Sequence, residues 1–481
     1  MRYKAVVRGL GLLILAEAAL MFPSVIVSLL YQDGSTHAFI KSIVVLLVAG
    51  LPIFFFVRPN ARALQTHDSF ALVALGWIVL SLFGMLPFLF SGTIHSPIDA
   101  FFEAVSGFST TSASVISNIE GLPEGILFWR CFMNWTGGMG VLVLTVALLP
   151  QLGIKNLDLF RAESPGPTPE KFLPRIRQSA KVLYGIYFGM SLLLFLLLMA
   201  VGLKPFDALV SAFSTAGTGG FSILNTSISG YNNVAAEIII AVFMLLFGIN
   251  FSIYFAVLVR QWKKVFSNQE FILYLFIVGI SILVVAFNIY PQYQNVFQSL
   301  RYSLFQVAAS ISTTGYYTAD YNLWPLLTQC ILLLLMTIGP CSGSTGGGMK
   351  LIRLLIAAKS LHKEQHNLLH PRIFRPISVD KKNIEEQTVR SVLVFNIAYF
   401  SIIIVSTLVV SLDGFDFLTT FSSVIAAISN HGVGLGVIGP SGNHGAFSTL
   451  SKIVLSFCML AGRLEIMPVM LLLTRSFWRR S

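Results

Sequence analysis

Long apolar runs separated by short polar segments dominate the chain from end to end. Runs of roughly twenty apolar residues have the length that a helix needs to cross the hydrocarbon core of a bilayer. Ten such runs lie at 9–30, 38–57, 69–91, 126–149, 183–201, 235–259, 271–290, 323–338 with 349–358, 392–411 and 447–473. This pattern predicts an all-α polytopic membrane protein.

A second pattern repeats between these runs. Four segments share an apolar residue followed by serine: "FSTTS" (108–112), "FSTAG" (213–217), "ISTTG" (311–315) and "ISNHG" (428–432). Each follows an apolar stretch too short to cross a bilayer, at 98–107, 205–212, 298–310 and 415–427. Each also lies between two full spans. The chain therefore repeats one unit four times: a span, a short helix, a loop of small residues and a second span. A repeat of this length indicates one structural module copied and stacked.

The repeat divides the chain into five expected parts. They are a two-helix accessory domain at 1–66 and four modules at 67–165, 166–267, 268–380 and 381–481. Non-helical backbone at membrane depth is tolerated only where it is buried in protein or lines a wet cavity. Four re-entrant loops around a pseudo-fourfold axis would bring carbonyl rings together, which can replace the hydration shell of an ion. A small-residue patch for helix packing is the alternative for any one loop, but four loops at one position favour a pore.

Charge placement gives the expected orientation. All but six of the 32 Lys and Arg residues fall on one side if the N-terminus is inside; the exceptions are Lys41, Arg130, Lys204, Arg301, Lys452 and Arg463. The positive-inside rule then places both termini in the cytoplasm. It also explains the net charge of +11 by membrane orientation, so this charge does not indicate nucleic-acid binding. The outer side collects the acids Asp33, Asp99, Glu103, Glu120, Glu124, Asp207, Glu237, Asp320, Asp413 and Asp416. These could attract cations or simply solvate loops and cap helices.

The N-terminal stretch and the cysteines do not change this prediction. The N-terminal stretch could pass for a signal peptide, but its apolar run continues through Leu30 without a small-residue cleavage site, so we expect an uncleaved first span. The four cysteines lie in or near predicted spans and imply no disulfide framework.

The four loops, together with "TGGMG" (136–140), "GPCSGSTGGGMK" (339–350) and "AGRLEIMPVMLLL" (461–473), closely resemble the Trk/Ktr/HKT potassium transporter superfamily. The two extra N-terminal spans resemble its TrkH/TrkG branch. The resemblance implies a potassium-conducting subunit of the bacterial inner membrane, surrounded by lipid and assembled as a homodimer with one pore per protomer. It also implies a TrkA-like cytoplasmic ring, so that nucleotide would act only through this partner.

Carried over by position, the resemblance implies a filter that binds K⁺ through backbone oxygens. Its residues would be Thr110, Thr111 and Ser112; Thr215, Ala216 and Gly217; Thr313, Thr314 and Gly315; Asn430, His431 and Gly432. The first loop has Ser112 where the bacterial family usually has glycine, which resembles the sodium-permeable branch of related plant transporters. Ser112 either relaxes selectivity or is tolerated with mild strain. We expect His431 to pack behind the filter.

The glycine-rich segment at 339–348 interrupts the second span of the third module. It lacks the spacing of a phosphate-binding P-loop, whereas a broken helix is typical of transporter centres. In the family it forms an intramembrane gate, here with Gly343, Ser344, Gly346, Gly347 and Gly348.

Arg463 lies in the middle of the last span, where an unpaired charge is costly. The resemblance places this arginine in the pore against the gate. A local pair with Glu465 is the alternative, although residues two apart on a helix face different ways.

Other function classes find less support. An intramembrane enzyme would need a nucleophile or metal ligands, and the eight histidines do not cluster in spans. His362, His366 and His370 share a helical face but fall on a cytoplasmic loop. A Na⁺-permeable protein or a H⁺- or Na⁺-coupled K⁺ symporter stays open, although no acidic pair lies deep in the spans.

Overall fold

The computed structural model describes residues 3–57, 66–140, 176–370, 376–380, 382–472 and 474. Within them the chain is a bundle of helices with one short antiparallel hairpin, whose two strands, β1 (Ser378–Val379) and β2 (Lys382–Asn383), have two residues each. Six helices are long and apolar enough to cross a membrane, or seven if one helix pair bent by 92° counts as one span. The predicted all-α polytopic architecture is therefore confirmed.

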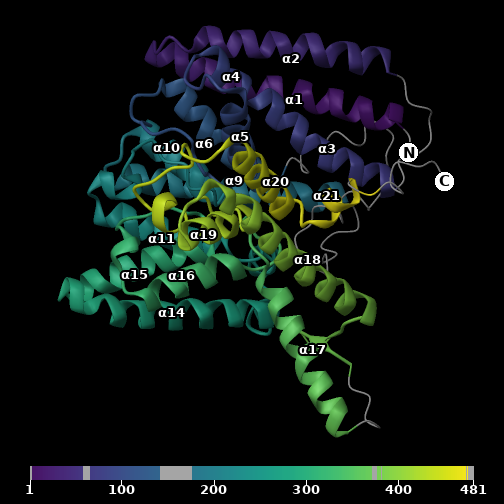
Figure 1. Cartoon of the computed structure of the whole chain (residues 1–481), viewed down its shortest axis with the longest axis vertical. Helices are drawn as coiled ribbons and strands as arrows, with labels where there is room; N and C mark the ends of the chain where they lie inside the picture. The colour runs from purple at the N-terminus through teal and green to yellow at the C-terminus, as the bar shows by residue number, and fades with distance from the viewer. Residues whose placement is uncertain are drawn as a thin grey trace.

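The first two helices form a hairpin along one side of the molecule (Figure 1). They are α1 (Tyr3–Tyr31) and α2 (Thr36–Phe56), and α1 packs against α3 of the first module. The close approach depends on small residues, because a Cβ on Gly11 would lie 2.5 Å from the side chain of Ile53.

The four modules then follow the expected order of outer helix, pore helix and inner helix. The first contains α3 (Thr66–Gly84), α4 (Leu86–Phe90), α5 (Pro97–Phe108) and α6 (Glu124–Gly138). The second contains α9 (Ile176–Ala200), α10 (Pro205–Ala216), η2 (Ser227–Tyr231), α11 (Val234–Phe247), α12 (Phe251–Leu258) and α13 (Trp262–Phe266). The third contains α14 (Gln269–Tyr293), α15 (Val296–Ile311), η3 (Tyr321–Leu323), α16 (Leu326–Ile338) and α17 (Leu351–Leu369). The fourth contains α18 (Glu386–Val410), η4 (Ser411–Asp413), α19 (Phe417–Ile428), η5 (Gly436–Ile438), α20 (Thr449–Arg463) and α21 (Met467–Leu472).

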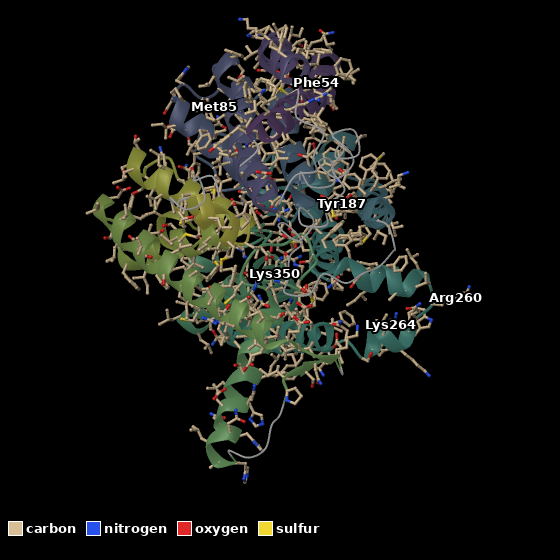
Figure 2. All side chains as sticks on the ribbon, turned by 90° about the vertical axis from the view of Figure 1, so that its right-hand side faces the viewer. Phe54, Met85, Tyr187, Arg260, Lys264 and Lys350 are labelled. Atoms are coloured by element: carbon tan, nitrogen blue, oxygen red, sulfur yellow. The ribbon has the colours of Figure 1, made fainter. Side chains whose placement is uncertain are left out.

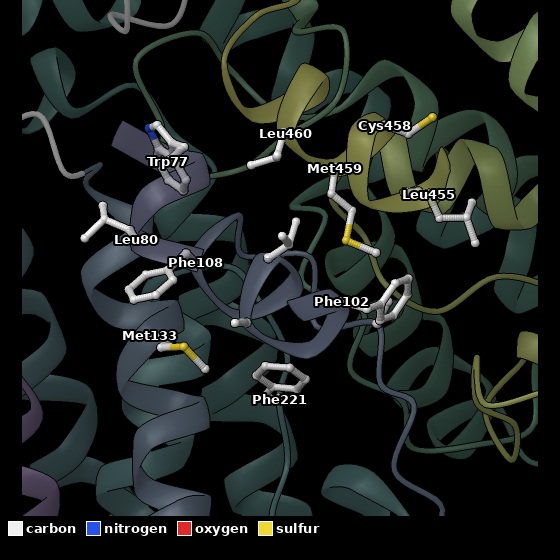
Figure 3. Packing of buried hydrophobic residues seen from close by; sticks show 14 of the residues in the cluster. Trp77, Leu80, Phe102, Phe108, Met133, Phe221, Leu455, Cys458, Met459 and Leu460 are labelled. Carbon is white, nitrogen blue, oxygen red and sulfur yellow. The ribbon is translucent and has the colours of Figure 1, made fainter. Parts of the chain in front are cut away.

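The pore helices α5, α10, α15 and α19 lie in the interior, and buried side chains surround them. Around α5, Phe108 and Phe102 pack with Met133 of α6 and with Met459 and Leu460 of α20 (Figure 3). Three of the four pore helices, all but α10, begin with a side-chain cap; for example, the Ser96 hydroxyl accepts from Asp99 N–H, and the Asp416 carboxylate accepts from Thr419 N–H. Their C-terminal ends, which carry the negative end of the helix dipole, point to the centre.

Three of the four inner helices are interrupted within the described residues, which the sequence indicated only for the third. α6 ends at Gly138; α11 and α12 are separated by residues 248–250; α16 and α17 are separated by 339–350; α20 and α21 are separated by 464–466. Several of the ten predicted spans are therefore broken helices rather than straight ones. The end of predicted span 126–149 beyond residue 140 lies outside the described residues.

α17 projects from the bundle at the end opposite α1 and α2 (Figure 1). Of the basic segments predicted to be cytoplasmic, Arg58 and Arg62, most of the 155–181 loop and the C-terminal arginines lie outside the described residues. Arg260 and Lys264 are at the periphery (Figure 2).

Asp33 fastens the accessory hairpin to the first module. Its carboxylate accepts from Ser35 N–H at 2.8 Å and, across the interface, from Gly125 N–H at the start of α6 at 2.6 Å. Burial alone would raise the pKa of Asp33, but hydrogen bonds from Ser28, Gly125 and Ser35 lower it below its ordinary value.

We expect Asp33→Asn to lower the free energy of unfolding by about 1 kcal/mol at neutral pH, after allowance for partial exposure. Because its folded pKa is depressed, the stabilisation by Asp33 is present above the unfolded pKa of about 4 and is lost as pH falls through the lower folded value. Thermal unfolding in detergent from pH 7 to pH 3 measures both. Equal stability of the two proteins at pH 7 would contradict the role of Asp33.

Candidate functional site

The four pore helices end in the same backbone conformation. Each C-cap (Ser109, Gly217, Ser312 and Ser429) is followed by a residue with positive φ, and a second one occurs two positions later. These pairs are Thr110 and Ser112 (57° and 61°), Thr218 and Gly220 (53° and 93°), Thr313 and Gly315 (60° and 78°), and Asn430 and Gly432 (55° and 80°). In each loop the residue after the first positive φ donates its N–H to a carbonyl five residues earlier, as Thr111 does to Ser106 at 2.9 Å. This is the Schellman ending of a helix, made four times.

The second loop differs from the expectation. Thr215 and Ala216 are still helical in α10, and Gly217 is the C-cap rather than the filter glycine. The residues that match Thr313, Thr314 and Gly315 in backbone conformation are instead Thr218, Gly219 and Gly220. The predicted filter residues Thr215, Ala216 and Gly217 are therefore misplaced by three positions, because "FSTAG" copies the letters of the other loops before its helix has ended.

The four loops are neighbours around one axis. A Cβ on Gly220 would lie 1.9 Å from the carbonyl oxygen of Thr314 in the third loop. One on Gly315 would lie 2.1 Å from the oxygen of His431, and one on Gly432 would lie 2.0 Å from the oxygen of Thr111. The loops thus meet in the order second, third, fourth and first, at distances that exclude any side chain.

The interface between the first and second loops is different. Ser112 occupies the position of the other three glycines, and its side chain lies 2.7 Å from the amide of Asn134 on α6. Asn134 also lies against the second loop, where a Cβ on Gly219 would be 2.3 Å from its Nδ2. Nothing in the sequence singled out Asn134, which is 22 residues beyond Ser112.

Hydroxyl groups of the loops are paired with one another. The Ser109 and Thr111 hydroxyls are 2.7 Å apart, and those of Ser312 and Thr314 are likewise 2.7 Å apart. Asn430 Nδ2 donates to Thr111 Oγ1 at 3.0 Å and to Met459 O at 2.8 Å. Thr110 Oγ1 and Asn430 Oδ1 are buried without a hydrogen-bond partner, and backbone carbonyls are the other loop oxygens that can coordinate a dehydrated cation.

His431 is fully buried, and its Nδ1 lies 2.6 Å from Val433 O. Its backbone carbonyl, by contrast, meets Gly315 of the third loop. The imidazole therefore packs against its own loop, while the main chain of His431 takes part in the ring.

Outer segments form a second closed ring above the loops. His444 N–H donates to Ser114 O at 2.8 Å and Ile119 N–H to Asn225 Oδ1 at 2.8 Å. The Tyr317 hydroxyl donates to Asn225 O at 2.6 Å, and Tyr321 donates to Gly434 O at 3.0 Å. These contacts join the modules in sequence. Burial, followed by the charge of Lys452, lowers the pKa of the His444 imidazole to about 4, so it is neutral at physiological pH.

Most of the outer acids have local partners. Asp99 pairs with Lys452 at 2.7 Å, Glu103 with Arg130 at 2.9 Å and Glu237 with Arg301 at 3.4 Å. Asp33, Asp320 and Asp416 accept hydrogen bonds from backbone N–H groups. The capping and pairing interpretation of these acids is therefore the better one, and three of the six exceptional basic residues serve as their partners.

The glycine-rich loop lies directly beneath the four loops. Gly347 N–H donates to Thr313 Oγ1 at 2.7 Å, and a Cβ on Gly347 would lie 2.2 Å from Ser429 O. Gly346 meets Ser312 O in the same way, at 2.6 Å. Gly343 and Gly348 have φ of 69° and 72°, and Gly343 O accepts from Phe251 N–H at the break between α11 and α12. Ser344, also buried, donates to Cys341 O at 2.6 Å.

Arg463, at the end of α20, joins the glycine-rich loop to the end of α6. Its guanidinium donates to Thr345 O in the glycine-rich loop at 2.8 Å, to Gly138 O at the end of α6 at 2.6 Å and to Gly137 O. Glu465, which the sequence offered as a local partner, forms an ion pair with Arg353 of α17.

Two further charged residues hold the ends of this loop. Glu270 at the start of α14 accepts from Ser342 N–H at 2.6 Å and from Ile352 N–H at 3.1 Å. Lys350, near the middle of the molecule (Figure 2), donates to Gly346 O. Glu270 could not be predicted from the sequence because it lies 72 residues before Ser342. Lys350 is the last residue of the glycine-rich motif, but the sequence alone assigned it no role.

Side-chain metal chemistry is not indicated by the part of the chain that is described. There, no group of three or more His, Cys, Asp or Glu is arranged to hold a metal ion. His366 and His370, at the end of α17, have ring centroids 5.0 Å apart and ring planes tilted by 53°. The four cysteines are free thiols.

Comparison with known proteins gives full-length matches. The family model described as "TrkH: Cation transport protein" matches residues 34–479. The chain is 37% identical to the Trk system potassium uptake protein TrkH of Halomonas elongata over 485 residues, covering 100% of both chains. It is 33% identical to TrkG of Escherichia coli, covering 98% of this chain and 97% of the other. The crystal structure of the potassium transporter TrkH from Vibrio parahaemolyticus superimposes with a TM-score of 0.88, at 36% identity and with 100% of both chains covered.

We expect Gly432→Ala to abolish cation flux into liposomes, because its Cβ would overlap the Thr111 carbonyl. Gly414→Ala is the matched control: φ is 78° at Gly414 and 80° at Gly432, but nothing lies within 4 Å of the position of a Cβ on Gly414. Both variants carry the left-handed penalty of about 1 kcal/mol, and only the first carries the clash. Equal flux through both variants would show that the close approach of the loops is unimportant.

Proposed function

Since the chain belongs to the TrkH family of cation transport proteins, we propose that it takes up potassium ions through a filter made by its four re-entrant loops. The observation that carries this proposal is the fourfold Schellman ending, with each loop in backbone contact with the next around one axis. Rings of carbonyl oxygens of this kind can replace the hydration shell of a dehydrated alkali cation. The relatives are named as potassium uptake proteins, which identifies the ion. The chain is a transport protein and not an enzyme.

The ions would be held by the backbone of four matching triplets. They are Thr110–Ser112, residues 218–220, Thr313–Gly315 and Asn430–Gly432. The four pore helices direct their partly negative C-terminal ends at the same point, which favours a cation there. Ser112 is the one feature that favours a second candidate, a filter that also passes Na⁺.

Purified protein in liposomes should take up K⁺, and excess external K⁺ should suppress uptake of a tracer more strongly than excess Na⁺. If Ser112 relaxes discrimination, Ser112→Gly should raise the permeability ratio of K⁺ to Na⁺. Protein-free liposomes are the control. A ratio that stays the same in Ser112→Gly would remove the sodium-permeable candidate, whereas equal suppression by the two ions in both proteins would contradict a potassium filter.

We further propose that the glycine-rich loop and Arg463 gate this pathway. The loop lies against the filter loops on one face, and on the other it is held by the Arg463 guanidinium. A positive charge below the filter repels cations, and its hydrogen bonds to Thr345 and to Gly138 hold the glycine-rich loop against the end of α6.

The regulation and assembly implied by the family resemblance remain proposals. A TrkA-like nucleotide-binding ring would dock on the side predicted to be cytoplasmic, where exposed basic residues such as Lys264 lie. A homodimer with one filter per protomer, in the bacterial inner membrane with both termini in the cytoplasm, fits the same orientation. Coupling of K⁺ entry to H⁺ or Na⁺ finds no specific support in the contacts of the filter.

Arg463→Ala should conduct K⁺ several times faster than the unaltered protein in liposomes without any partner ring, because both the barrier charge and the link to Thr345 are lost. Lys264→Ala, which removes a positive charge at the periphery (Figure 2), is the control and should leave the rate unchanged. An Arg463→Ala rate equal to that of the unaltered protein would count against the gate.

A further inference from the structure

The contact between the first and second filter loops is built differently from the other three. At the others a glycine Cα faces a carbonyl so closely that a Cβ would lie 1.9 to 2.1 Å from the oxygen. Ser112 carries a Cβ at the matching position, with φ of 61°. Since van der Waals contact forbids a Cβ at such a distance, the backbones of the first two loops stand farther apart than the others.

Asn134 fills the space that this separation creates. With its amide oxygen oriented toward the donors, Asn134 accepts from Ser112 Oγ at 2.7 Å and from Phe221 N–H, just after the second loop, at 3.3 Å. Its Nδ2 then donates to Gly107 O at the end of the first pore helix, at 2.8 Å. One fully buried amide thus joins the pore helix, the first loop and the second loop.

The position of Asn134 is fixed by its helix. The backbone oxygen of Asn134 would lie 2.2 Å from a Cβ on Gly217, and its side chain would overlap any side chain on Gly219. The preceding residue, Met133, packs beside the first pore helix (Figure 3), and a Cβ on Gly107 would lie 2.7 Å from its side chain. This explains why the second loop reads Gly-Thr-Gly-Gly where the third reads Ser-Thr-Thr-Gly.

We infer that Asn134 is a positioning residue for selectivity, which holds the first filter loop in place because that loop carries serine instead of glycine. The inference rests on the proposed filter. The Ser112 hydroxyl is partly buried, so leaving it without a partner has a cost, and the left-handed conformation is strained for serine. The hydrogen bond to Asn134 offsets both and turns the Ser112 side chain away from the axis. Without it, the first loop is free to change its carbonyl positions.

The test is a double-mutant cycle on the permeability ratio of K⁺ to Na⁺ in liposomes. Asn134→Ala should lower the ratio by about fivefold, the effect of losing one buried hydrogen bond. In the Ser112→Gly background the same substitution should change the ratio by less than about twofold, because the bond is already absent. Ser112→Ala keeps the Cβ and removes only the hydroxyl, so it should lower the permeability ratio as much as Asn134→Ala does. The double variant Ser112→Ala with Asn134→Ala should have a ratio no lower than that of either single variant.

Thr136→Ala is the matched control on the same helix. Its hydroxyl is buried but bonds only to carbonyls of its own helix, Phe132 O and Met133 O, so the ratio should not change. Potassium flux above that of protein-free liposomes verifies that each variant is assembled. An equal shift by Asn134→Ala with and without Ser112, or no shift with Ser112 present, would overturn the inference. Absence of K⁺ flux from the unaltered protein would instead overturn the proposed function.

Discussion

The structure depends on the approach of one loop's carbonyl oxygen to the next loop's glycine. At three of the four interfaces this approach leaves no space for even a methyl group. Such contacts are not strong in themselves, so the surrounding protein must hold the backbones together. The pore helices, the interlocked outer segments and the interrupted inner helices all do so, each through buried packing or backbone hydrogen bonds.

Much of the fold could be predicted from the sequence, because bilayer length and apolar composition restrict the possibilities strongly. The four modules, their short helices and the central position of the loops follow from that periodicity alone. The register of the second loop could not be obtained in this way. In the sequence, Ser214 aligns with the serines of the other three loops, but in the structure the helix cap that corresponds to those serines is Gly217. A helix can end on serine or on glycine with the same backbone conformation.

Contacts between distant segments were also out of reach. Asn134, Glu270 and Lys350 carry no motif of their own that assigns a role, and their importance arises from what the fold places beside them. The breaks after α11 and after α20 could not be predicted for a related reason. The apolar composition continues across each break, so the sequence predicts one continuous span where the chain in fact turns. Arg463 was recognisable as an intramembrane charge, but its link to the end of α6 was not.

Three inner helices are interrupted within the described residues, and α6 ends at Gly138, which gives the region under the filter loops a common design. Main-chain groups freed at one break are satisfied by another: Gly248 O accepts from Cys341 N–H, and Gly343 O accepts from Phe251 N–H. Helix breaks inside a bilayer are acceptable only when their polar groups find such partners. Among the breaks within the described residues, the third is the longest and packs against the filter loops, which is why we propose it as the gate.

Because the four quarters of the ring belong to a single polypeptide, a substitution alters one quadrant and leaves three untouched. In a channel assembled from four identical subunits, the same change would occur four times and its steric cost would multiply. A one-chain ring can therefore accept a serine in one quadrant and adjust the helix behind it, as the chain has done with Ser112 and Asn134. Ion preference can in this way change by small steps, through lateral asymmetry rather than through a new ring.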